Sequence, residues 1–417
     1  MNYINKIGGW TYKILRRSQK YTGTDNVYLA KSGFWLTLGQ FFSLVVTFLS
    51  AVAFANLLDP TTYGNYKYVL SLLGILAVFC LDGMRTAVTQ AVARGFEGSF
   101  YTAFITKLKW GLLGSLVAIG GAAYYWVRGN NLLPIPLLIS AIFLPLMYAS
   151  QLYGAFLNGR KLFRIQVNYE IISRIFFTGT IITALFFTRN LFWLIAVYFV
   201  SNTFLNYFFY FLTKIKFRPN KKEDQETLNY GKHLSLMSVI NYLATYLDKI
   251  LLFTFVGPAQ LAVYSFAVLI PEQIKNMTAD INALALPKLS LKSREEIKAS
   301  MMKKIWKLTL LTGAIIVFYI VIAPYFFKIF FPQYLSSVPY SQILMFTIIS
   351  FPVSLISTAF HAKLMKKEQY LLRLVAFSRI ILLAVLAPLY GIWGVIAARI
   401  GAEIVSLSLM LFLFRKF

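Results

Sequence analysis

Apolar stretches long enough to cross a lipid bilayer recur along this whole chain. A transmembrane helix needs about 20 mostly apolar residues, because each residue advances the helix by about 1.5 Å. Only 13% of the 417 residues are charged, whereas about a quarter are charged in a typical soluble protein. The sequence therefore predicts an all-α integral membrane protein with twelve transmembrane helices. The predicted spans lie near residues 33–55, 68–90, 110–128, 134–157, 169–188, 191–213, 233–256, 261–285, 305–327, 340–360, 371–388 and 391–413.

Lysine and arginine residues gather on one side of this predicted membrane domain. Thirty of them lie in the amino-terminal segment, in the loops after even-numbered spans and in the carboxyl tail. The loops on the other side hold only Lys67, Arg128, Arg189 and Lys328. Loops rich in Lys and Arg stay in the cytoplasm, so both termini are predicted to be cytoplasmic. The same bias accounts for the net charge of +26 without a nucleic-acid partner.

The spans divide into two groups of six. Residues 33–213 are predicted to form one bundle and residues 233–417 the other, with a charged cytoplasmic linker at 214–232 between them. Residues 1–32 are predicted to be a cytoplasmic or interfacial segment, because their apolar and basic residues alternate as in an amphipathic helix.

A weak internal repeat relates the two halves. Because six helices per half is an even number, the repeats are predicted to run parallel, related by an axis along the membrane normal. The repeat pairs Pro60 with Pro258 and Asp82 with Asp280 at an offset of 198 residues, and Arg174 with Arg379 at an offset of 205.

Thirteen charged residues remain inside the predicted spans. Each costs about 2.5–3.5 kcal/mol at the centre of a bilayer, so an inert wall should not contain so many. They predict a polar, mainly cationic cavity between helices, and hence a transporter of an anionic cargo. Eight form pairs on one helix face, where opposite charges partly neutralise each other. The pairs are Asp82 with Arg85, Glu170 with Arg174, Glu272 with Lys275 and Arg399 with Glu403; the other five charges are Asp248, Lys249, Asp280, Arg373 and Arg379.

Five short motifs carry a family resemblance. They are Leu57-Leu58-Asp59-Pro60-Thr61-Thr62-Tyr63-Gly64-Asn65-Tyr66, Leu81-Asp82-Gly83, Tyr246-Leu247-Asp248-Lys249-Ile250-Leu251-Leu252, Val263-Tyr264-Ser265 and Leu286-Pro287-Lys288-Leu289-Ser290. In this order, and over nearly the whole chain, they resemble the signatures of bacterial polysaccharide flippases of the O-antigen repeat-unit type. These flippases belong to the superfamily that includes the MATE multidrug exporters. Twelve spans suit them better than the lipid II flippases, whose pattern has two more helices.

The resemblance implies a MATE-like fold in the bacterial inner membrane, with two six-helix bundles around a central cavity. The implied cargo is an undecaprenyl-pyrophosphate-linked oligosaccharide. It would move from the cytoplasmic to the periplasmic leaflet by alternating access, coupled to counter-flow of H⁺ or Na⁺. The implied partners are this cargo, membrane lipids, a polysaccharide polymerase and a chain-length protein.

Eight of the intramembrane charges are candidates for roles in the site. A guanidinium group can bind pyrophosphate through two parallel hydrogen bonds, although Arg174 and Arg379 could instead reach back toward the lipid headgroups. A buried carboxylate can exchange a coupling cation, or it can remain in a permanent ion pair. The candidates for binding pyrophosphate or sugar are Arg174, Arg379, Arg85 and Lys275; the candidate cavity acids are Asp82, Asp248, Asp280 and Glu272.

Two further features leave alternatives open. Asp248 and Lys249 are adjacent and point about 100° apart on a helix, so only one of them can face a given cavity, and the resemblance favours Asp248. The aromatic residues Tyr242, Tyr246 and Tyr264 could stack on sugar rings, with helix packing as the alternative.

Catalysis is not indicated. The only histidines are His233 and His361, the only cysteine is Cys80, and no metal-ligand spacing or nucleotide-binding motif is present. The sequence predicts no catalytic residue, no metal and no cofactor. Two alternatives to a flippase remain: a cation-coupled multidrug exporter of the same fold, and a membrane polysaccharide polymerase.

Overall fold

The computed structural model describes residues 26–417, except residues 291, 364 and 416. Every regular element in this described part is a helix. Most of the predicted segment 1–32 lies outside the described residues. The first half contains α2 (Asn26–Leu57), α3 (Pro60–Leu76), η1 (Ala77–Cys80), α4 (Met84–Ala93), α5 (Ser99–Val127), α6 (Pro134–Ser150), α7 (Leu152–Gly159), α8 (Phe163–Phe187) and α9 (Leu191–Phe217). The second half contains α10 (Gln225–Val256), α11 (Pro258–Ala267), α12 (Leu269–Ser290), α13 (Arg294–Phe330), η2 (Pro332–Ser337), α14 (Val338–Leu344), η3 (Met345–Ser350), α15 (Phe351–Ala362) and α16 (Lys366–Arg415).

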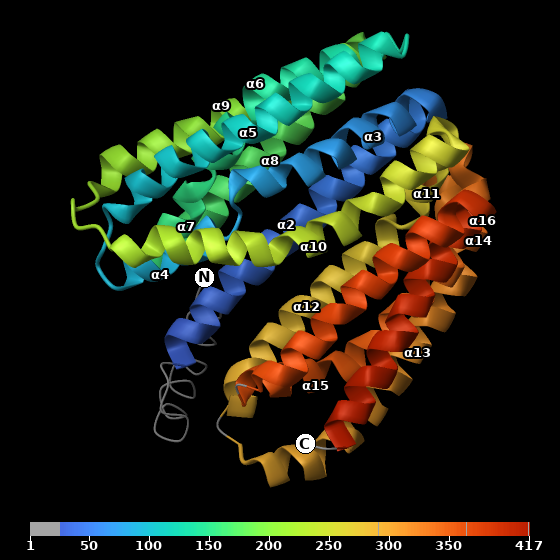
Figure 1. Ribbon diagram of the computed structural model, residues 1–417. Helices are drawn as coiled ribbons and strands as arrows, with labels where there is room; N and C mark the ends of the chain where they lie inside the picture. The colour runs from blue at the N-terminus through green and yellow to red at the C-terminus, as the bar shows by residue number, and fades with distance from the viewer. Residues whose placement is uncertain (1–25, 291, 364, 416) are drawn as a thin grey trace, which may run out of the picture.

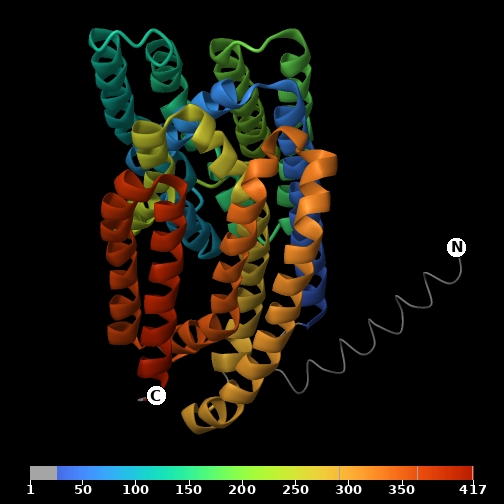
Figure 2. The same cartoon turned by 90° about the vertical axis from the view of Figure 1, so that its right-hand side faces the viewer.

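Ten helices among the described residues are long and apolar enough to cross a membrane. One of them, α16, turns back on itself at Gly391, where φ is 56° (Figure 2), so it carries two of the predicted spans. Predicted span 261–285 is occupied by α11 and α12, which meet at Val268. Neither of these two helices is among the ten that are long and apolar enough to cross a membrane. The layout is consistent with the twelve predicted helices.

The helices form two groups (Figure 1). One group, blue to green, contains α2 to α9, and the other, yellow to red, contains α11 to α16. They meet where α3 lies against α11 and diverge toward the end where the C-terminus lies. The halves therefore touch closely at one end of the molecule.

The contact between α3 and α11 follows from local sequence. Pro60 and Pro258 each occupy the first turn of their helix, where proline needs no hydrogen-bond donor. Asp59 caps α3 by accepting a hydrogen bond from the Thr62 amide at 2.9 Å. At Gly64, a Cβ would lie 1.9 Å from the Pro258 carbonyl oxygen, so only glycine allows this approach. The paired prolines of the internal repeat thus begin two helices in contact.

Helix α10 connects the two groups. On its first-half side, the ring of Phe253 stacks on Tyr68 with centroids 3.7 Å apart, and the Ser235 hydroxyl accepts a hydrogen bond from the Gly83 amide at 3.0 Å. On its other side, α10 packs along α16. Any pocket against α10 is therefore close to both halves.

Buried apolar residues form three clusters. The largest lies at the end where α3 contacts α11, which we call the closed end. It contains residues from both halves, including Tyr63 of α3, Phe266 of α11 and Tyr334 of η2. The other two are confined to one half each, around Phe156 in the first and Phe360 in the second. A shared core at one end and separate cores at the other match the divergence of the helices.

Candidate functional site

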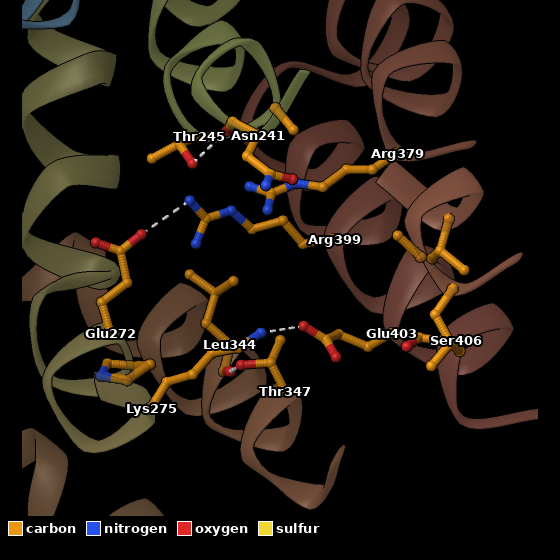
Figure 3. Close-up of a pocket in the computed structure, with 15 residues that line it drawn as sticks. Asn241, Thr245, Glu272, Lys275, Leu344, Thr347, Arg379, Arg399, Glu403 and Ser406 are labelled. Atoms are coloured by element: carbon orange, nitrogen blue, oxygen red, sulfur yellow. Dashed lines mark hydrogen bonds and ion pairs between the residues drawn. The ribbon is translucent and has the colours of Figure 1, made fainter. Parts of the chain in front are cut away.

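A cavity of about 380 Å³ lies between α10, α12, α16 and the η3 region of the second half. We call it the arginine pocket (Figure 3). Its charged lining residues extend toward one another from α12 and α16. They are Glu272, Lys275, Arg379, Arg399 and Glu403.

Beside this pocket, a buried network is centred on Asp248 of α10. Its carboxylate is completely buried and accepts two hydrogen bonds from Arg399, at 2.5 Å from Nη2 and 3.0 Å from Nε. The Tyr264 hydroxyl donates a third at 2.7 Å. Arg399 also donates to Glu272 at 2.9 Å. A buried charge is tolerated when it is paired and hydrogen-bonded, and this network meets both conditions.

The remaining two bases of the arginine pocket are held differently. Lys275 forms an ion pair with Glu403 across the pocket. Arg379 forms an ion pair with Asp248, but its Nη2 lies 3.6 Å from Oδ2, beyond hydrogen-bond distance. The Nε of Arg379 is buried, and no acceptor for it is found in the described part of the chain. Arg379 is therefore the base of this pocket with unused donor capacity.

These ion pairs differ from the pairs that the sequence spacing predicts within single helices. The sequence pairs Glu272 with Lys275 and Arg399 with Glu403 on their own helices. In the structure, Arg399 reaches Glu272 and Lys275 reaches Glu403, so each pair joins α12 to α16. Long basic side chains that face a shared pocket can reach an acid on the opposite wall.

A second cavity, of about 720 Å³, lies between α4, α7 and α8 of the first half and the facing side of α10. We call it the first-half pocket. Asp82 and Arg85 line it, together with polar residues such as Asn158 and Gln166. Asn241 of α10 lines both this cavity and the arginine pocket, so α10 separates the two.

The predicted site residues thus fall into five groups. Glu272, Lys275 and Arg379 line the arginine pocket, Asp82 and Arg85 line the first-half pocket, and Asp248 is buried beside the former. Arg174 is exposed on α8 and is not among the residues that line either pocket. The side chain of Asp280 lies outside the described residues.

Two local features differ from the sequence expectation. Asp82 does not lie inside a helix, because the chain breaks between η1 and α4, where Leu81 adopts a left-handed conformation with φ of 51°. Glu170 accepts a hydrogen bond from Gln166 at 3.0 Å, and no ion pair between Glu170 and Arg174 is found in the described residues.

Sequence reasoning missed Lys67. We expected it in an outer loop, but it lies in α3, within the membrane-crossing segment Pro60–Cys80. The signal was present: an N-cap aspartate followed by proline marks a helix start at Pro60, eight residues before the predicted span begins. Lys67 lines a third cavity with Lys249, described below.

The arrangement of the helices defines the fold class, which is the fold of MATE-like membrane proteins. A MATE-family multidrug transporter of the MOP superfamily, in an inward-facing conformation, is similar over 90% of this chain and 95% of its own, with a TM-score of 0.63 and 13% identity. The lipid II flippase MurJ, in an inward closed conformation, is similar over 90% of this chain and 86% of its own, with a TM-score of 0.63 and 17% identity.

A third similar structure is a MOP-superfamily transporter from Pyrococcus furiosus, described as having a binding pocket of reverse polarity. It covers 93% of this chain and 95% of its own, with a TM-score of 0.59 and 13% identity. A search of curated protein sequences found no match.

Residues 53–339 match the family model described as polysaccharide biosynthesis protein. This is more than half of the chain, so the protein belongs to that family. The match and the shared fold confirm the predicted family resemblance and the all-α, MATE-like architecture. The similar structures are described as transporters and a lipid II flippase.

Proposed function

We propose that this protein translocates an undecaprenyl-pyrophosphate-linked oligosaccharide, such as an O-antigen repeat unit, from the cytoplasmic to the periplasmic leaflet of a bacterial inner membrane. Membership of the polysaccharide biosynthesis family supports the cargo class. The observation that carries the proposal is Arg379, a base at the edge of a membrane-embedded pocket whose buried Nε has no acceptor in the described chain. An anion offers that missing acceptor.

The arginine pocket suits a diphosphate for two reasons. Three bases and two acids line it, and Asp248 beside it makes the charges equal in number, but the buried Nε of Arg379 is still without an acceptor in the described residues, which favours an anion. A guanidinium also offers a fixed pair of donors that matches phosphate oxygens. We assign pyrophosphate binding first to Arg379, and then to Lys275, which would have to leave its ion pair with Glu403, because Arg399 is held by two acids, Asp248 and Glu272. Arg85 in the first-half pocket would contact the sugar, and the polyprenyl tail would remain in the lipid.

Directed movement requires a second ligand that binds the two states differently. We assign this role to H⁺ or Na⁺ at the acids of the arginine pocket. Arg399 donates to Glu272 at one oxygen, Oε1, so a cation at the other oxygen of this carboxylate would weaken its pairing with Arg399. Asp248 accepts more hydrogen bonds than Glu272, so we assign it a structural role. Asp82 and Asp280 remain candidates for binding the coupling cation.

The test is a leaflet-accessibility assay in proteoliposomes with a fluorescent undecaprenyl-pyrophosphate-linked oligosaccharide. The Arg379→Gln variant should translocate at least about tenfold more slowly, because a charge-assisted hydrogen bond contributes about 1.5–3 kcal/mol. Arg379→Lys should recover part of the rate. Lys328→Met, an exposed change at the end of α13, serves as the control.

Absence of translocation by the wild-type protein would refute the proposed function. A normal rate in Arg379→Gln would refute the role of the arginine pocket. The same vesicles should be tested with a cationic dye, since a multidrug exporter would move the dye and leave the lipid-linked sugar in place. A third assay for new glycosidic bonds covers the polymerase alternative.

A further inference from the structure

A third cavity, of about 210 Å³, lies on the first-half side of α10. It is enclosed by α3, α6, α9 and α10, all of which belong to membrane-crossing segments. We call it the lysine–tyrosine pocket. Its polar lining residues are Lys67, Ser71, Tyr148, Tyr198, Tyr246 and Lys249.

The two lysines carry charge into this pocket from different helices. Each ammonium group lies over a tyrosine ring, with Lys67 Nζ 5.3 Å from the centroid of Tyr63 and Lys249 Nζ 5.7 Å from that of Tyr246. No ion pair to either lysine is found among the described residues. An unpaired lysine within a membrane-crossing segment is costly, which is why such residues mark pathways for charged ligands.

The nearest acids are already engaged. Asp248 and Glu272 both accept hydrogen bonds from Arg399, on the other side of α10. The carboxylate of Asp248 is completely buried in that network, although Lys249 follows it directly in sequence. The two lysines therefore face a cavity in which no protein carboxylate is a lining residue.

The rest of the wall is aromatic and polar. Tyr148, Tyr198 and Tyr246 are half-buried, and none of their hydroxyl groups has a hydrogen-bond partner in the part of the chain described. The ring of Tyr246 rests directly on α3, because a Cβ on Gly74 would lie 2.3 Å from its Cζ. Ring faces together with free hydroxyl groups suit a sugar, which presents both C–H and O–H groups.

We propose that the lysine–tyrosine pocket binds an acidic sugar of the cargo, with the sugar carboxylate between Lys67 and Lys249. This inference rests on the proposed function and adds to it a chemical class, an oligosaccharide that contains a uronic acid. The carboxylate supplies a counter-charge in direct contact with the lysines, whereas Glu272 and Asp248 act on them only from beyond ion-pair distance, and the tyrosines contact the ring. The volume has room for one sugar ring, so recognition concerns a single residue of the repeat unit.

The experiment measures equilibrium binding in lipid nanodiscs with two probes. One is an undecaprenyl-pyrophosphate-linked disaccharide that ends in glucuronate, and the other is the same molecule ending in glucose. The wild-type protein should bind the glucuronate probe at least about tenfold more tightly, the factor expected for one charge-assisted contact. Lys67→Met and Lys249→Met should each remove most of this preference and leave the affinity for the glucose probe within about twofold.

Size-exclusion chromatography reports whether each variant is folded, and Lys328→Met should keep the full preference for the glucuronate probe. Equal wild-type affinity for the two probes would overturn the inference. So would a parallel loss of both probes in the lysine variants, because the lysines would then hold the pyrophosphate that both probes share. Binding is measured separately from translocation. If the protein prefers the glucuronate probe but translocates neither probe, the proposed function is refuted and the binding inference is retained.

Discussion

At the scale of single residues, Asp248 links three helices through one carboxylate. It lies in α10 and binds Tyr264 of α11 and Arg399 of α16, and its side chain has no exposed surface. Removing one member of a buried ion pair leaves the other charged and unpaired, at a cost of about 3–5 kcal/mol. We expect Asp248→Asn and Arg399→Gln each to lower the free energy of unfolding by that amount, measured by SDS titration in mixed micelles.

The double variant Asp248→Asn/Arg399→Gln separates this pairing from general damage. Because both charges are gone, its loss should be smaller than the sum of the single losses by about 1–3 kcal/mol. Additive losses would show that the two residues stabilise the protein independently, contrary to the geometry.

Glu97 provides a pH-dependent contact outside the membrane-crossing segments. It lies between α4 and α5 and accepts hydrogen bonds from Arg160 at 2.6 and 2.7 Å. These bonds, with one from the Asn220 amide, hold the pKa of Glu97 below its ordinary value of 4.5 despite its burial. A carboxyl group whose pKa is lowered by folding stabilises the protein fully above its unfolded pKa, and this contribution is lost as the pH falls through the folded pKa.

Glu97→Gln should therefore lower the free energy of unfolding by about 1–2 kcal/mol at pH 7, and by progressively less as the pH falls below 4.5 and through the lowered pKa of Glu97. The measurement is an SDS titration repeated across this pH range. Glu223→Gln, which changes an exposed acid nearby, is the matched control. If the loss of unfolding free energy in Glu97→Gln stays constant down to low pH, the ionised Glu97 carboxylate is not the stabilising group.

Residue spacing could predict that the charges of the arginine pocket lie in the membrane, but not which of them meet. Glu272, Lys275 and Arg379 were singled out from sequence, and the structure places all three around one pocket. Their partners are set by helix packing: Lys275 pairs with Glu403, 128 positions away. No local pattern encodes such a contact, because it depends on how α12 and α16 are rotated toward each other.

At the scale of elements, the crossing of α3 and α11 depends on Gly64. We expect Gly64→Ala to destabilise the protein by about 1–3 kcal/mol, because the added Cβ would lie 1.9 Å from the backbone oxygen of Pro258 and force the helices apart. Gly313→Ala in α13 is the control, since a Cβ there meets no atom within 4 Å. That variant should be neutral or more stable, because alanine favours a helix. Thermal unfolding in detergent distinguishes the two; equal behaviour would contradict a tight crossing.

Helix boundaries explain most of the differences between the expected and observed elements. Hydropathy finds apolar runs, so it placed the second span at 68–90 and missed the polar first turns of α3. It also passed through the break at Leu81, since a left-handed leucine has no sequence signature comparable to glycine. The all-α class and the paired starts at Pro60 and Pro258 were predictable, because both follow from local rules.

At the scale of the whole molecule, the two halves share a core at one end only. The cluster around Tyr63 and Phe266 crosses between them, whereas the clusters around Phe156 and Phe360 do not. In alternating access by rocking, the contacts between the halves at the closed end would open, and the separated ends of the two halves would approach each other. Contacts across the closed end should therefore have to break in every transport cycle.

A cross-link across the closed end tests this directly. The Asn56 side chain of α2 donates to the Phe330 carbonyl of α13 at 3.0 Å, so these positions are neighbours in opposite halves. Cys80 is the only cysteine, so Cys80→Ala gives a protein without cysteines into which the two new ones are introduced. Joining Asn56→Cys to Phe330→Cys with a short bifunctional thiol reagent should abolish translocation but leave cargo binding, and reduction of a cleavable link should restore it.

The matched control places both cysteines in one half. The hydroxyl groups of Ser50 in α2 and Thr178 in α8 lie 3.2 Å apart, and both helices belong to the first group. Linking Ser50→Cys to Thr178→Cys should leave translocation near the uncross-linked rate, because a half that moves as a unit keeps this distance. If the link between halves were equally harmless, the halves would not separate at α2 and α13, and transport would have to proceed by movement within a bundle. Inhibition by both links would instead indicate that the first half itself deforms during the cycle.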